Sequence, residues 1–134
     1  MAYPVIDQKT ESHSYVVEKV TTTLTLVETA PGQFGILYEA KYSGVKDGHV
    51  SGGPLSVSGN GEYVVNKNPE ITVTISNYSN TGSNISMQIK IYVNAYGGHT
   101  IFNQALGGSF GGDPVKAIFD NMTELYEKNA LKTA

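Results

Sequence analysis

Apolar and polar residues alternate along much of this chain, and this two-residue period constrains its fold more than any other feature. It is clearest in ISMQIKIYVNAY, residues 85–96, where every odd position is apolar and the even positions carry polar residues or tyrosine. Successive side chains of a β-strand point to opposite faces, so this stretch predicts a half-buried strand with its odd positions inward. The same period recurs upstream, and we therefore expect a fold made mainly of antiparallel strands.

Turn-forming residues separate the alternating stretches. APGQ at 30–33 places Pro and Gly at the central positions of a type II turn, and Asn60-Gly61 is a typical hairpin turn. The glycine-rich segment 43–53 is interpreted as a loop. The expected strands are 14–28, 34–42, 54–66 with a turn inside it, 70–76, 85–96 and 99–106. In the first strand, the side chains expected to face inward, opposite a row of threonines, are Val16, Val20, Leu24 and Leu26.

Beyond about residue 112 the apolar period changes from two residues to 3.6. Asp113 is a good N-cap, Pro114 suits the first helical position, and apolar residues then follow helical spacing. An isolated helix of this length is marginal in water, so it must dock on the sheet or on another chain. We expect one domain, 1–134: an antiparallel β-sandwich or small β-barrel of six to eight strands over about 14–110, with one C-terminal amphipathic α-helix over about 114–131.

Composition argues against several classes of function. The chain has no cysteine, which rules out disulfides and thiolate chemistry, and its nine basic residues are scattered lysines with a net charge of −3. Without arginine or a basic stripe, neither nucleic-acid binding nor membrane binding is predicted. The N-terminal residues lack the features of a signal peptide, which favours a cytoplasmic protein. The alternative is secretion after a signal peptide has been removed.

The glycine-rich stretch GGHTIFNQALGGSFGGDP, residues 97–114, allows two interpretations. Paired glycines between a strand and a capped helix are mostly a structural joint, but they could also form a mobile loop beside a ligand site. The stretch matches neither a phosphate-binding loop nor a dinucleotide fingerprint. No cofactor is therefore predicted.

Candidate catalytic residues are few. Glu18 is the acid on the inward parity of the first strand, where it could serve as a general acid or base, unless a bulge shifts the parity or Glu18 lies beyond the core. Tyr38 and Tyr42 share the apolar face of the next strand, and with His99 they could face a cavity. Asp47 and His49 could contribute to a cation site, but Asp47-Gly48 also suits a turn, and no metal is predicted.

Candidate ligand-binding residues lie on the polar face of the clearest strand. Tyr92, Asn94 and Tyr96 form a row there, and His99 and Asn103 follow in the glycine-rich stretch. Aromatic faces could stack on sugar rings while amides bond hydroxyl groups. The alternative is that the helix or a second subunit covers this face.

Three functions follow as hypotheses. The first is a small soluble β-domain that binds an uncharged or weakly charged ligand, such as a glycan or small polar molecule. The second is a structural or self-assembling homo-oligomer, joined through the C-terminal helix or edge strands. The third is a small barrel enzyme of the isomerase or hydrolase type, with Glu18, Tyr38 or His99 in a cavity.

Overall fold

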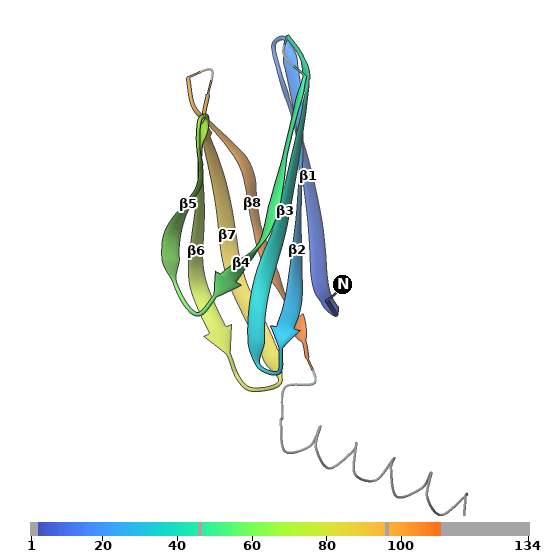
Figure 1. The fold of residues 1–134 in the computed structure, drawn as a ribbon, viewed down its shortest axis with the longest axis vertical. Helices are drawn as coiled ribbons and strands as arrows, with labels where there is room; N and C mark the ends of the chain where they lie inside the picture. The colour runs from blue at the N-terminus through green and yellow to red at the C-terminus, as the bar shows by residue number, and fades with distance from the viewer. Residues whose placement is uncertain (1–2, 46, 96, 111–134) are drawn as a thin grey trace, which may run out of the picture.

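The chain folds into two four-stranded antiparallel sheets, each a simple meander (Figure 1). The computed structural model describes residues 3–45, 47–95 and 97–110. The first sheet contains β1 (Val5–Tyr15), β2 (Glu18–Ala30), β3 (Gln33–Gly44) and β4 (Gly48–Val57). The second contains β5 (Gly61–Lys67), β6 (Glu70–Asn80), β7 (Asn84–Asn94) and β8 (His99–Ser109). The mainly β, antiparallel prediction is confirmed, while the helix predicted over about 114–131 lies outside the described residues. Within the described ranges, no helix is long and apolar enough to span a bilayer.

The core lies between the two sheets and follows the predicted parity. Val20, Leu24 and Leu26 of β2 are buried, as are the odd-numbered residues of β7 from Ile85 to Val93. On the outer face of β2 the threonines form a cross-strand ladder with β1. Its hydroxyl pairs include Thr23 with Thr10 at 3.0 Å and Thr21 with Ser12 at 3.1 Å. Such cross-strand pairs help to fix the register of a sheet.

The strand predicted over 14–28 is in fact two strands. A tight turn at Val16 and Val17 separates β1 from β2, and Val16, predicted to face inward, is fully exposed at the tip. Valine is not typical of turns, so the alternating sequence gives no indication that the strand is interrupted at Val16 and Val17. β1 itself was not predicted because its inward positions opposite β2 are polar over most of its length.

The glycine-rich 43–53 segment, interpreted as a loop, instead contains the first half of β4. Gly52 pairs with Tyr38 of β3, and the Tyr38 ring lies so close over it that a Cβ would clash. The turn at 30–33 has Gly32 with φ of 73°, as a type II turn requires. Asn60-Gly61 does mark a turn, but β4 and β5 belong to different sheets, so it forms no hairpin.

β1 and β8 lie side by side where the edges of the two sheets meet, a junction that we call the seam. Side chains of β1 form hydrogen bonds to β8 across it. The Asp7 carboxylate accepts a hydrogen bond from the Gly107 backbone N–H at 3.1 Å, and the Glu11 carboxylate accepts one from Asn103 N–H. The carboxylates are four residues apart, as are the amides they bind. These contacts satisfy N–H groups on the free edge of β8, where a foreign strand could otherwise pair.

Candidate functional site: a cleft at one end of the sandwich

The two sheets leave a cleft at one end of the sandwich, the upper end in Figure 1, where β1 is followed by β2, β3 by β4, β5 by β6 and β7 by β8. We call it the end cleft. It consists of two adjoining chambers with volumes of about 420 Å³ and 310 Å³. Both volumes fall in the size range of small-molecule sites. The residues that line both chambers are Glu18, Tyr42, Val93 and Ala95.

The walls of each chamber come from strand ends and turns. The larger chamber is completed by residues of β4 and of the turn between β5 and β6, including His49, Val50, Asn68 and Pro69. The smaller is completed by apolar residues of the hairpin tips and by β8, including Val17, Val20, Val45 and Ile101. Val16, Val17 and Val45, which are exposed at the hairpin tips, therefore lie at the mouth of the smaller chamber. Most of this surface is apolar, with a few polar groups among the side chains.

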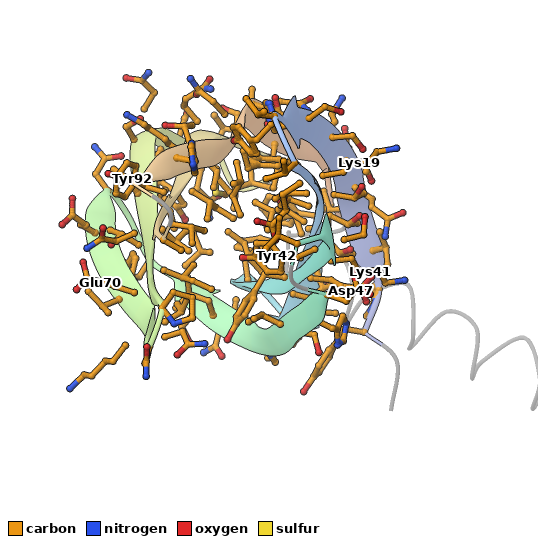
Figure 2. All side chains as sticks on the ribbon, turned by 90° about the horizontal axis from the view of Figure 1, so that it is seen from above. Lys19, Lys41, Tyr42, Asp47, Glu70 and Tyr92 are labelled. Carbon is orange, nitrogen blue, oxygen red and sulfur yellow. The ribbon has the colours of Figure 1, made fainter. Side chains whose placement is uncertain are left out.

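Tyr42 lies between the sheets, at the boundary of the two chambers (Figure 2). It follows Ala40, a buried core residue on the same face of β3, so strand parity directs its ring inward. Its hydroxyl oxygen is buried and has no hydrogen-bond partner among the residues that the structure describes. Burial raises the pKa of the Tyr42 phenol above its ordinary value, and the Glu18 carboxylate adds to the rise. Tyr42 thus stays a neutral hydroxyl at physiological pH.

Glu18 is the first residue of β2. It lies two residues before the buried Val20, so both side chains are on the same face of the strand. The prediction that Glu18 points inward and the alternative that it lies beyond the core both hold in part, because it is half-buried and lines both chambers. No hydrogen bond or ion pair joins its side chain to another of the described residues. A half-buried carboxylate without such partners retains its full capacity to accept hydrogen bonds or pair with a cation.

Tyr15 and His99 form the wall where β1 meets β8. Their rings lie 4.1 Å apart between centroids, and the Tyr15 hydroxyl donates to the Thr100 carbonyl at 3.4 Å. Burial raises the pKa of the Tyr15 phenol. His13 packs behind Tyr15, with ring centroids 6.4 Å apart, and its buried Nε2 has no hydrogen-bond partner. This row of rings closes the smaller chamber on one side.

The structure brings together some of the predicted site residues and separates others. Glu18, His99 and Asn94 all line the end cleft. Tyr38 does not: it lies four residues from Tyr42 along β3, about 13 Å away at the usual rise of a strand. It packs against the core and covers Gly52.

Of the predicted ligand-binding residues, Asn94 and His99 line the cleft, whereas Tyr92 and Asn103 do not. Tyr92 is 40% exposed on the outer face, and its hydroxyl lies over Gly98, where a Cβ would clash with it. Asn103 is exposed on β8, and its side-chain carbonyl accepts from Gln88 Nε2 at 2.9 Å. Tyr96 lies outside the described residues. Covering a glycine is a structural role that explains Tyr92 without a ligand.

Asp47 and His49 serve local structure at the mouth of the larger chamber. The Asp47 carboxylate accepts a hydrogen bond from Gly44 N–H at 3.1 Å, which supports the turn interpretation. His49 Nε2 lies 3.6 Å from a carboxylate oxygen of Glu39. Among the residues that the structure describes, no group of three His, Asp or Glu side chains could hold a metal ion.

Sequence reasoning missed several cleft residues, including Tyr15, Val45 and Asn68. Tyr15 lies within the strand predicted over 14–28, on the parity expected to face outward, and the unpredicted turn at Val16 and Val17 changes that parity. The other two lie in turns whose placement no local pattern reveals. No protein-family model, curated protein or solved structure matches the chain.

Proposed function

We propose that this protein binds a small, uncharged or weakly charged molecule with an apolar body in the end cleft. One observation carries the proposal: two adjoining chambers with mostly apolar walls meet at Tyr42, whose buried hydroxyl has no hydrogen-bond partner. Ligand sites in proteins combine apolar walls with a few fixed polar groups in this way. A buried polar group without a partner is unfavourable, and a ligand able to bond to it would relieve that cost.

The polar groups in the cleft are few and come from different strands. Glu18 and Tyr42 lie at the junction of the chambers. The other polar side chains are His49, Asn68 and Asn94 on the wall of the larger chamber and Tyr15 and His99 on the wall of the smaller one. This set suits a ligand with one or two hydrogen-bonding groups on a hydrocarbon frame. A glycan, with hydroxyl groups on most of its carbons, would leave many of them facing apolar walls. Glycan binding by the row on β7, self-assembly and catalysis by a barrel enzyme stay predictions without further support.

Binding can be tested with N-phenyl-1-naphthylamine, an uncharged dye whose fluorescence rises in apolar surroundings. We expect saturable binding to the wild-type protein. Ala95→Phe places a ring at the wall common to both chambers and should weaken binding at least tenfold. Ala105→Phe makes the same substitution at an exposed position of β8, and should leave binding unchanged. Absence of saturable binding, or equal binding by both variants, would refute the proposal.

A further inference from the structure

We propose that the ligand of the end cleft carries a protonated amine, which the Glu18 carboxylate holds between the two chambers. This inference rests on the proposed function and adds the chemical class of the ligand. It is carried by the position of Glu18 at the junction of the chambers. In addition, the ion pairs among the described residues involve Glu39 and not Glu18. This inference narrows the proposed ligand from uncharged or weakly charged to one with a single ammonium group, a choice that an apolar cleft alone would not make.

The charge distribution of the cleft is one-sided. Glu18 is the one carboxylate among the described lining residues, and these include no lysine. Lys19 and Lys41 lie on the outside of the sandwich (Figure 2), and Lys67, the last residue of β5, is exposed and does not line either chamber. Lys41 is 3.4 Å from the Glu39 carboxylate on that outer face. A cation inside the cleft would therefore meet attraction from Glu18 without competition from a described lysine on its walls.

The surroundings of Glu18 strengthen this preference. Apolar side chains such as Val20 and Val93 reduce the local dielectric constant, so a charge pair there attracts more strongly than one in water. The Tyr42 hydroxyl, adjacent to Glu18, can accept a hydrogen bond from an ammonium N–H. Aromatic rings of Tyr42 and Tyr15 offer faces to which organic cations are attracted. An anionic ligand would be repelled by Glu18 from either chamber.

The test compares three compounds with one carbon skeleton: cyclohexylmethylamine, cyclohexylmethanol and cyclohexanecarboxylate. Each competes with N-phenyl-1-naphthylamine for the wild-type protein at pH 7. We expect the amine to bind at least tenfold more tightly than the alcohol, and the carboxylate to bind more weakly than both. This order needs no variant and therefore does not depend on the folding of a mutant.

Glu18→Gln removes the charge and keeps the shape of the side chain. We expect it to abolish the preference for the amine over the alcohol: amine binding loses a charge pair and should weaken at least tenfold more than alcohol or dye binding does. Glu62→Gln, at an exposed position of β5, is the matched control and should bind all compounds as the wild type does. Equal affinities for amine and alcohol with dye binding intact would overturn this inference while the proposed function stands. Failure of the dye to bind the wild type would overturn both.

Discussion

The two ends of the sandwich are built from the same strands, yet one is filled and the other is hollow. At the end formed by the turns 30–33, 57–61 and 80–84, which we call the closed end, Phe34 packs edge-on against Phe110 with ring centroids 4.6 Å apart. At the other end the inward positions are occupied by Glu18, Tyr42 and Ala95, and two chambers remain. This comparison shows that the alternation of apolar and polar residues decides which side chains face inward. Their volume and polarity decide whether the space between the sheets is filled.

The largest effect that we expect comes from emptying the closed end. Phe34 is 3% exposed, so Phe34→Ala should reduce the free energy of unfolding by about 3–5 kcal/mol. Tyr42→Ala removes a ring from an end that is already open, and should cost clearly less. Urea unfolding followed by circular dichroism measures both. Equal losses would show that the ends are packed alike and would break the comparison.

A smaller effect should come from the seam that holds the sheets together along β1 and β8. Asp7→Ala removes the acceptor of the Gly107 N–H and should lower stability by about 1 kcal/mol. Hydrogen exchange at the Gly107 amide should accelerate, while Glu62→Ala at an exposed position leaves it unchanged. An unaltered exchange rate in Asp7→Ala would show that the Asp7–Gly107 hydrogen bond does not hold the two sheets together at the seam.

The smallest effect concerns the hydroxyl of Tyr42 and depends on pH. The pKa of the Tyr42 phenol is raised in the folded state, so folding favours the neutral phenol over the phenolate. Relative to the charged form, this contribution to stability is fully present below the unfolded pKa of about 10. That contribution is lost as pH rises through the folded pKa. Tyr42→Phe should therefore be as stable as the wild type near pH 7, or slightly more so, and should lose less stability on alkaline titration. Parallel alkaline profiles for the two proteins would place Tyr42 in water and not in the wall of a cleft.

Much of the fold could be predicted from sequence, for an identifiable reason. Alternation in 85–96 and 20–26 reports burial on one face, and the observed core follows it in both places. Most of β1 was not predicted because Asp7 and Glu11, which hydrogen-bond to the edge of β8, interrupt any apolar alternation along it. The first half of β4 was not predicted because glycines interrupt it, and at least two of them are required by β3: Gly52 makes room for the Tyr38 ring and Gly53 for the backbone at Ile36. Both failures involve a partner strand, which a single-sequence pattern does not contain.

The candidate site was predictable only in part. Parity identified Glu18 as an inward acid and placed Tyr42 on the apolar face, and both line the cleft. The cleft itself depends on how far the sheets separate beyond Val20 and Val93. No local property of the sequence encodes that distance. Residues that are remote in sequence, such as Val45 and Ala95, line the same cleft only because eight strands run up and down in order.

The most direct test of the open end is a methyl NMR titration with N-phenyl-1-naphthylamine. Val20, Val93 and Ile101 line the cleft, whereas Val57, Ile85 and Leu106 are buried toward the closed end. We predict saturable chemical-shift changes in the first group and none in the second. Changes centred on the closed end, or no changes at saturating dye, would contradict the existence of a ligand-accessible cleft at the end bounded by Glu18 and Tyr42.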